Sequence, residues 1–353
     1  MRHTLTQLND ISLPGIDIDE LRSTEQLYRF RAPASYLQLI DPTDPEDPIR
    51  KIVIPDRLEM RALGGLDPTD EAIYTPVKGL QHKFSDTALL LVTSNCAAYC
   101  RYCFRKRLFQ PENNDVPRVL DEPLDYIRAH PEINNVILSG GDAFSLPTEK
   151  LIAILESLCA IDSVRIIRIG SKTPAFDPQR ILKNTRLLDA LARLSDGRIQ
   201  FYLMAHFDHS REVTAAARQS IRMLRRAGLT CLNQCPLVDG VNTMKGALSE
   251  LFDEMAFIGC HQYYVFHCRP TDGNSHFMLP LDKAFSIFER ESRSGSGLSK
   301  TARYCIAHKA AKLQVLCVDG SQVFLKYLQA HKNELTGQTF WHSLSDSLED
   351  SML

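Results

Sequence analysis

Residues 89–107 read LLLVTSNCAAYCRYCFRKR, and this stretch decides the fold. It opens with a continuous apolar run, which is typical of a parallel strand buried on both faces. The run passes directly into three cysteines, Cys96, Cys100 and Cys103. Thiolates in this C-x3-C-x2-C spacing can bind three irons of a cubane and leave the fourth iron open. The sequence therefore predicts a [4Fe-4S] site at the carboxyl end of a buried strand.

A zinc site is the alternative interpretation of the three cysteines. Structural zinc takes four protein ligands. The next candidates along the chain are His130 and Cys159, which are distant in sequence. The spacing therefore favours an iron-sulfur cluster.

The same kind of apolar run recurs between residues 86 and 289, alternating with amphipathic helical segments. We expect helices over 148–160, with Thr148 as N-cap, and over 211–227, ending at Gly228. Right-handed crossovers between such strands give an α/β fold, here a partial (β/α)6 barrel, with the site at the carboxyl ends of the strands. The six predicted strands are 88–93, 135–139, 164–169, 199–205, 230–236 and 262–267.

Two flanking segments complete a predicted three-part organisation. Residues 1–85 are expected to form a helical and loop extension, and residues 86–289 the barrel core. Residues 290–353 are expected to form a small C-terminal segment that covers one mouth of the barrel, with strand-like runs at 313–318 and 322–325.

Composition limits the classes of partner. The 353 residues carry a formal net charge of -2 and no apolar run of membrane-spanning length, so we expect a small-molecule substrate, no nucleic acid and no membrane. The start of the chain lacks the apolar core of a secretory signal, which predicts a cytoplasmic protein. Of ten cysteines only three are grouped, and Cys231 and Cys235 are expected to pack in the core.

A second motif, Leu138-Ser139-Gly140-Gly141-Asp142, ends the second predicted strand. Consecutive glycines allow a ligand to approach the backbone, and an aspartate beyond them can accept hydrogen bonds from an ammonium group. Together with the cysteine loop, this motif resembles the radical S-adenosylmethionine (SAM) superfamily. That resemblance implies that Gly140, Gly141 and Asp142 bind the amino group of SAM.

Over most of its length the chain resembles one family, the lysine 2,3-aminomutases. The resemblance implies a 1,2-amino migration on an amino acid, started by a 5'-deoxyadenosyl radical. It also implies pyridoxal 5'-phosphate (PLP) as a further cofactor and a one-electron reductant such as flavodoxin or ferredoxin; a homo-oligomer is left open. The similar stretches are 39–55, 89–107, 136–144, 168–174, 205–209 and 233–242, together with His276 and Phe277.

The resemblance also implies roles for single residues. Arg105 corresponds to an arginine that binds the substrate carboxylate, a task suited to a planar bidentate donor. His206 and Gln234 correspond to residues that contact SAM. Lys172, in the stretch GSKTP, is a candidate to reach a phosphate or carboxylate.

The chain departs from the family pattern at two places. The Gly-rich run that carries the PLP lysine is missing, and Lys300, in GSGLSKT, is the best remaining candidate for the imine. The family's aspartate for the lysine ammonium is replaced by Arg269, with Asp272 three residues further on. Reversing this charge should repel a cationic substrate, so we expect an altered choice of amino acid.

Three functions therefore compete. The first is an amino-acid 2,3-aminomutase with altered substrate choice. The second is a PLP-independent radical SAM enzyme that abstracts hydrogen from another substrate, and the missing Gly-rich run motivates it. The third is a non-catalytic iron-sulfur protein, which would have no need of Gly140, Gly141 and Asp142.

Overall fold

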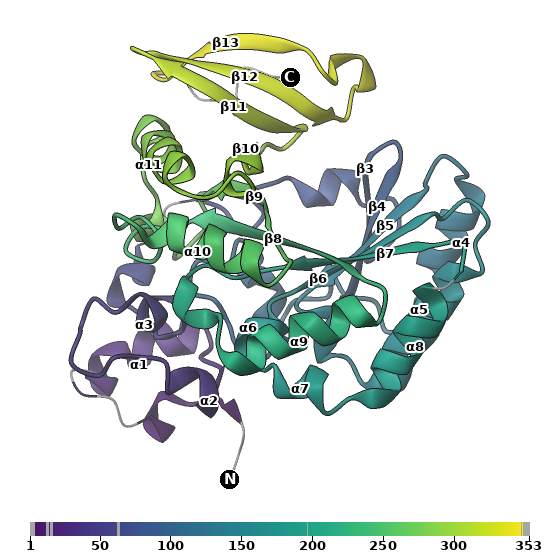
Figure 1. Cartoon of the computed structure of the whole chain (residues 1–353), viewed down its shortest axis with the longest axis horizontal. Helices are drawn as coiled ribbons and strands as arrows, with labels where there is room; N and C mark the ends of the chain where they lie inside the picture. Colours follow the sequence, from purple (N-terminus) through teal and green to yellow (C-terminus); the bar gives the residue numbers. More distant parts are fainter. Residues whose placement is uncertain are drawn as a thin grey trace.

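One large sheet organises the chain. The computed structural model describes residues 4–11, 14, 17–61, 64–195, 197–346 and 348. Within them, eleven strands follow the order β13-β12-β11-β10-β9-β8-β7-β6-β5-β4-β3 (Figure 1). Strands β4 to β10 run parallel, and the strands at both ends of the sheet are antiparallel to their neighbours. The strands are β3 Leu80–Phe84, β4 Thr87–Thr93, β5 Asn135–Gly140, β6 Ile166–Ser171, β7 Gln200–Ala205, β8 Thr230–Leu237, β9 Gln262–His267, β10 Arg303–Ala307, β11 Ala311–Asp319, β12 Gln322–Ala330 and β13 Thr339–Ser343.

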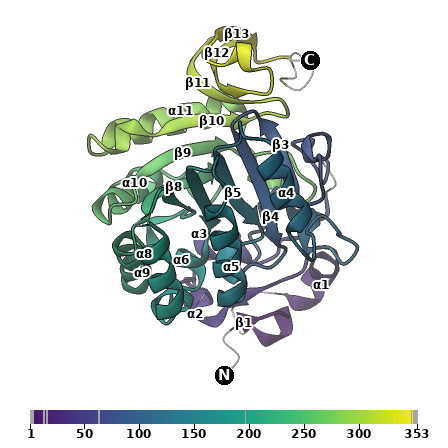
Figure 2. The ribbon, with the colours of Figure 1, turned by 90° about the vertical axis from the view of Figure 1, so that its right-hand side faces the viewer.

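Helices that follow the strands pack on the outer face of the curved sheet (Figures 1 and 2). Helix and strand side chains share one large apolar core, to which Leu155, Leu224 and Leu251 belong. No helix in the described ranges has the length and hydropathy needed to cross a bilayer. The helices of the barrel are α4 Asp121–Ala129, α5 Thr148–Cys159, α6 Thr173–Phe176, α7 Gln179–Leu182, α8 Thr185–Ser195, α9 Ala215–Arg226, α10 Ala247–Phe257 and α11 Leu281–Ser294.

Side-chain alternation explains how each strand serves two environments. On β5, Val136 and Leu138 point outward into the helix-covered core. Successive side chains of a strand point to opposite faces, so Asn135 and Ser139 point into the interior. All six predicted strands are present as β4 to β9. The prediction missed β10, a seventh parallel strand, because the short segment RYCIA begins with an arginine and follows a Gly- and Ser-rich loop.

Two predicted helix starts need correction. Thr148 is the first residue of α5 rather than its N-cap, and its Oγ1 accepts a hydrogen bond from Asn184 at 2.8 Å. Helix α9 begins after Thr214, whose hydroxyl caps Ala217 N–H at 3.2 Å. The preceding segment, Ser210–Glu212, forms a separate 3-10 turn. The predicted end at Gly228 is confirmed, with a φ of 91°.

The N-terminal segment forms a second apolar core against the cysteine loop. Ile52 and Tyr36 of this segment cluster with Ala98 and Tyr102 of the loop. The amide of Arg101 donates to the carbonyl of Ile52 at 2.9 Å, which ties the two backbones together. The N-terminal elements are β1 Thr4–Leu5, α1 Ile18–Leu27, β2 Ala32–Pro33, α2 Ala34–Leu37 and α3 Pro48–Val53.

Strand β3, at one end of the sheet, lies near the segments that follow β10 and β12, and no backbone ladder joins them in the described residues. Figure 2 shows β3 below β10 and β11. Lys83 of β3 donates its ammonium to the carbonyl of His308, which follows β10. The ring of His331, after β12, bonds the carbonyl of Lys83 at 2.9 Å and packs on Tyr74. The strand-like runs predicted near the C-terminus are confirmed as β11 and β12. The division at residues 85 and 289 stays a prediction.

Candidate active site

The three cysteines of the loop after β4 lie close together. Cys96, Cys100 and Cys103 are free and half-buried. Burial raises the pKa of the Cys96 thiol, and the Asp142 carboxylate and the other two thiols raise it further. Such mutual effects require short separations, and a thiol with a raised pKa stays neutral until a metal displaces its proton.

Three thiols on one loop fit the ligand set of a cubane. Within the described part of the chain, no three potential metal ligands surround one common ion position. A cubane does not require this, because each thiolate binds a different iron. Three half-buried thiols on one loop can therefore hold a [4Fe-4S] cluster with one iron left open.

A buried ion cluster fastens the loop to the N-terminal segment. The Arg101 guanidinium donates through Nε and Nη2 to both carboxylate oxygens of Glu59, each at 2.8 Å. It also donates to the carbonyls of Tyr28 and Arg29 at 3.1 Å. Lys106 donates to Glu59 at 2.9 Å from the other end of the loop. Burial raises the pKa of Glu59, but Arg101 and Lys106 outweigh it and the net shift is downward.

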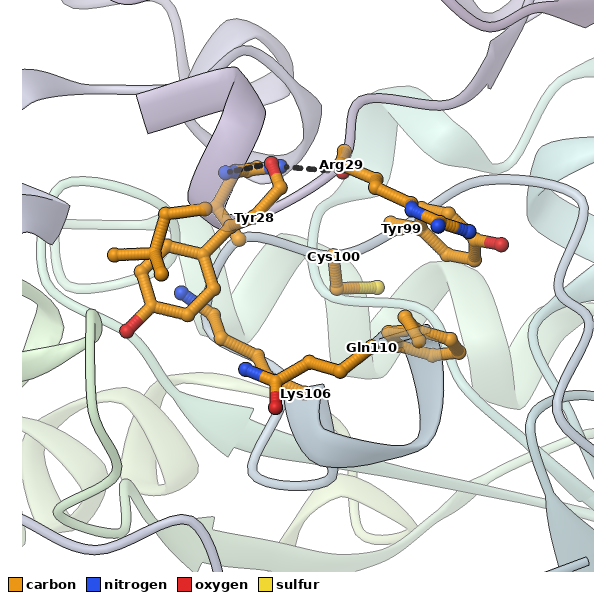
Figure 3. A pocket seen from close by; sticks show the side chains of 9 residues that line it. Tyr28, Arg29, Tyr99, Cys100, Lys106 and Gln110 are labelled. Carbon is orange, nitrogen blue, oxygen red and sulfur yellow. Dashed lines mark hydrogen bonds between the residues drawn. The ribbon is translucent and has the colours of Figure 1, made fainter. Parts of the chain in front are cut away.

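A small pocket opens beside Cys100, between the N-terminal segment and the loop. In Figure 3, Arg29 and Tyr99 lie on one side of the Cys100 sulfur and Lys106 and Gln110 on the other. Cys100, which is half-buried, is one of the residues that line this pocket.

The Gly140-Gly141-Asp142 motif holds the cysteine loop in place. The amide of Gly141 donates to Thr93 O at 2.6 Å, and that of Asp142 to Asn95 O at 2.8 Å. A Cβ on Gly140 or Gly141 would lie 2.3 Å from one of these carbonyl oxygens. Both glycines are thus required by the packing of β5 against the loop.

The Asp142 carboxylate is already saturated by protein donors. It accepts from the Ser171 hydroxyl and from the amides of Lys172, Thr173 and Phe144, at 2.8–2.9 Å. This differs from the expected contact with the ammonium of SAM. The placement instead makes Asp142 a residue that positions the ends of β5 and β6.

A second buried network lies beneath the cysteine loop. Asp208 accepts from the ammonium of Lys172 and from the hydroxyl of Tyr102, and Lys172 also contacts Glu212 at 2.8 Å. His206 Nε2 lies 3.0 Å from the Asp208 carboxylate. The Lys172 ammonium is therefore paired with two protein carboxylates, which argues against the predicted contact with a phosphate or carboxylate of a ligand. His206 keeps part of its ring accessible beside Tyr102.

Arg105 reaches the interior but is already paired. It donates to one carboxylate oxygen of Glu71 at 2.9 and 2.6 Å and to Ser139 Oγ at 2.9 Å. Arg107 binds the other oxygen of Glu71. A substrate carboxylate at Arg105 must therefore share it with Glu71.

The remaining predicted residues fall in three different places. Gln234 lies on the inner face of β8, since its neighbour Cys235 points into the outer core. Arg269 is buried and donates to the carbonyl of Pro68. The Asp272 carboxylate raises the pKa of Tyr28, in the N-terminal segment, after the larger effect of burial.

The structure does not bring Lys300 to the site. This lysine is exposed and precedes β10, so it lies at the amino ends of the parallel strands, whereas the cysteines lie at the carboxyl ends. Its ammonium donates to the carbonyl of Gly295 at 3.2 Å, and Ser299 is bonded to Asp253 of α10 at 2.9 Å. This placement argues against the predicted imine role.

Several site residues were not predicted from the sequence. Glu59 and Glu71 are 42 and 34 residues away from the arginines that they bind, and no local pattern marks them. Arg168 and Lys312 point into the interior from β6 and β11. An inward-facing cation in an otherwise apolar strand was the available signal for Arg168.

The parallel barrel and the cysteine loop at its carboxyl edge define a class of enzyme. The sequence profile described as the Radical SAM superfamily matches residues 90–245, from β4 to the turn after β8. The chain is a radical SAM enzyme, a class that uses a [4Fe-4S] cluster and SAM.

The relatives narrow the class, and the chain belongs to the lysine 2,3-aminomutase family. It is 42% identical over 92% of its length to an Aquifex aeolicus protein provisionally named L-lysine 2,3-aminomutase, of which it covers 87%. It is 38% identical over 77% of its length to L-lysine 2,3-aminomutase of Clostridium subterminale, of which it covers 63%. It is 31% identical over 82% of its length to glutamate 2,3-aminomutase of Clostridioides difficile, of which it covers 68%. Lysine 2,3-aminomutases also use PLP.

Proposed function

We propose that this enzyme moves an amino group between Cα and Cβ of an amino acid whose side chain is neutral or anionic. Membership of the family supports the reaction class. One relative is named for glutamate, whose side chain is anionic, whereas others are named for lysine, whose side chain is cationic.

The positive charge of the barrel interior supports a neutral or anionic substrate. Arg168 and Lys312 face the interior, and Arg269 lies buried at the carboxyl end of β9 in the register where the family resemblance expects an aspartate. The Glu71 carboxylate is committed to Arg105 and Arg107. Like charges repel strongly in a partly desolvated site, so a cationic side chain is disfavoured there.

The chain's own residues then take the following proposed roles. Cys96, Cys100 and Cys103 hold the cluster, and the backbone at Gly140 and Gly141, with His206 and Gln234, borders SAM. Arg105 binds the substrate carboxylate and orients the amino acid, while the surrounding protein excludes water. The bound cofactors supply one-electron cleavage of SAM and stabilisation of the migrating amino group.

A substrate panel tests this function. Anaerobically reconstituted enzyme with SAM, PLP and a chemical reductant is incubated separately with glutamate, glutamine, alanine and lysine. Chromatographic separation of the isomers followed by mass spectrometry should detect a β-amino acid from one of the first three substrates. The kcat/KM with lysine should be at least tenfold lower. Preferred turnover of lysine would contradict the substrate assignment. Cys103→Ser serves as the inactive control.

The missing Gly-rich run favours a second candidate, hydrogen abstraction without PLP. The two candidates differ in cofactor content. An active preparation that contains iron but no PLP would support the second candidate, whereas PLP at one equivalent per chain would exclude it.

We also propose a small one-electron protein, flavodoxin or ferredoxin, as reductant and the cytoplasm as location. All ten cysteines are free, which suits a reducing compartment. Purified reduced flavodoxin or ferredoxin should support formation of 5'-deoxyadenosine from SAM. Failure of both donors, when a chemical reductant works, would contradict the assignment.

A further inference from the structure

Two cations in the barrel interior form no ion pair with the described residues. Arg168 donates its Nε to the neutral amide oxygen of Asn135 at 3.0 Å, and the Asp86 carboxylate acts on it only from a distance. The ammonium of Lys312 lies over the ring of Tyr264, 4.9 Å from its centroid, and has no hydrogen bond within the described ranges. Enclosed charge without a counter-ion is costly, so this pair indicates an anionic ligand.

Lys312 also has the character of a nucleophile. Burial, and then the charge of Arg168, lower the pKa of its amine from 10.5 to about 8. At pH 7.5 about one amine in four is then neutral, against about one in a thousand for an ordinary lysine. The side chain is half-buried and lies on the inner face of β11, opposite the core residues Ala311 and Leu313. A neutral amine in such a place can add to a carbonyl carbon.

Four other lysines are bound by protein groups or lie away from the site. Burial and Arg269 lower the pKa of Lys83 to about 7, but its ammonium is bonded to the His308 carbonyl. Lys172 is ion-paired with Asp208 and Glu212. Lys106 is paired with Glu59. Lys300 is exposed at the opposite ends of the strands.

We propose that Lys312 is the residue that forms the Schiff base with PLP, and that Arg168 provides positive charge for an anionic group of the same cofactor. The inference rests on the use of PLP in the proposed function and moves the attachment from Lys300 to β11. The neutral Nζ adds to the aldehyde carbon, a C=N bond forms, and the aldehyde oxygen leaves as water. No oxidant or reductant is needed.

Chemical trapping locates the attachment without measuring catalysis. The anaerobic, iron-loaded protein is mixed with PLP, and borohydride reduces the C=N bond to a stable amine. After digestion, mass spectrometry should find the pyridoxyl group on the peptide that contains Lys312. An adduct on Lys83, Lys300 or Lys309 instead would overturn the proposal.

Matched variants sharpen the test. Lys312→Ala should lose at least nine-tenths of the adduct, whereas Lys300→Ala should keep it. Thermal unfolding and iron content show whether each variant is folded. Arg168→Gln should keep attachment at Lys312 but raise the half-saturating PLP concentration about tenfold. Undiminished adduct in folded Lys312→Ala, or no PLP uptake by iron-loaded wild type, would overturn the inference.

The outcomes separate this inference from the proposed function. Formation of a β-amino acid with PLP attached to another residue would contradict the role of Lys312 and support the proposed amino migration. Trapping of PLP on Lys312 without conversion of any amino acid would support the role of Lys312 and contradict the proposed amino migration.

Discussion

Arg101 and Glu59 form a buried, two-pronged ion pair, with Nε and Nη2 of the arginine each 2.8 Å from the carboxylate. Arg101 lies between the second and third cysteines of the loop, whereas Glu59 belongs to the N-terminal segment. Both side chains are almost inaccessible to solvent. The pair therefore fixes the loop that carries the thiols to a part of the chain that precedes the barrel.

Glu59→Gln should destabilise the protein by about 3–5 kcal/mol, because Arg101 then stays buried without its counter-ion. Iron content after reconstitution should fall as the loop loses its anchor. The matched control is Glu20→Gln, since Glu20 pairs with Arg57 at the surface and its loss should cost about 1 kcal/mol at most. Urea unfolding and iron assay give the two readouts. Equal effects of both variants would contradict the anchoring role.

Replacing any one of Cys96, Cys100 and Cys103 by serine should abolish the iron-sulfur absorbance and the formation of 5'-deoxyadenosine. A hydroxyl is a poor replacement for a thiolate ligand of iron. Cys159→Ser is the control, because Cys159 lies half-buried on α5, away from the loop. Full cluster content in one of the three loop variants would remove that cysteine from the ligand set.

Gly140→Ala should destabilise the protein by about 1–3 kcal/mol through overpacking, because its new methyl group would lie 2.3 Å from the Thr93 carbonyl oxygen. The φ of 108° at this position adds strain for any other residue. Gly297→Ala, where a methyl group meets nothing within 4 Å, should be neutral. Thermal unfolding of both variants makes the comparison, and a tolerated Gly140→Ala would refute the packing requirement.

Glu71 should give a pH-dependent contribution to stability. Burial raises the pKa of Glu71, but Arg105 and Arg107 outweigh it and bring the pKa from 4.5 to about 2. Since the folded-state pKa is depressed, the contribution is complete above pH 4.5 and is lost as the pH falls toward 2. A shift of this size corresponds to about 3 kcal/mol.

Urea unfolding of wild type and Glu71→Gln at several pH values checks this expectation. The wild type should be the more stable at pH 7, and its advantage should shrink at pH 3. An advantage independent of pH would show that the carboxylate charge at Glu71 contributes nothing.

The barrel was predictable from the sequence because β4 to β9 are short, largely apolar segments separated by amphipathic helices. Strand β10 escaped prediction because it is short and begins with Arg303. Its absence from the prediction had a consequence for the site. Without β10, nothing in the sequence indicated that Lys300 lies at the amino ends of the parallel strands, opposite the cysteines. Nor did it indicate that Lys312 lies after β10, on the inner face of β11.

The electrostatic part of the site could not be predicted, because it depends on contacts between distant segments. The motif Gly140-Gly141-Asp142 marked the correct strand end, yet its carboxylate binds Ser171 and neighbouring amides of the next strand end. Likewise, the charge of Lys172 suggested a ligand, but Asp208 and Glu212 neutralise it. A single sequence gives the residue types and not their partners.

The contact between Lys83 and the carbonyl of His308, together with the bond from His331, joins β3 to the segments after β10 and β12 without a backbone ladder in the described residues. Parting this junction would break a few polar contacts and leave every inter-strand ladder intact. Local opening there should therefore cost less free energy than separation of any two paired strands. The wall of the barrel is therefore expected to be weakest on this side, where separation leaves the hydrogen bonds between paired strands unchanged.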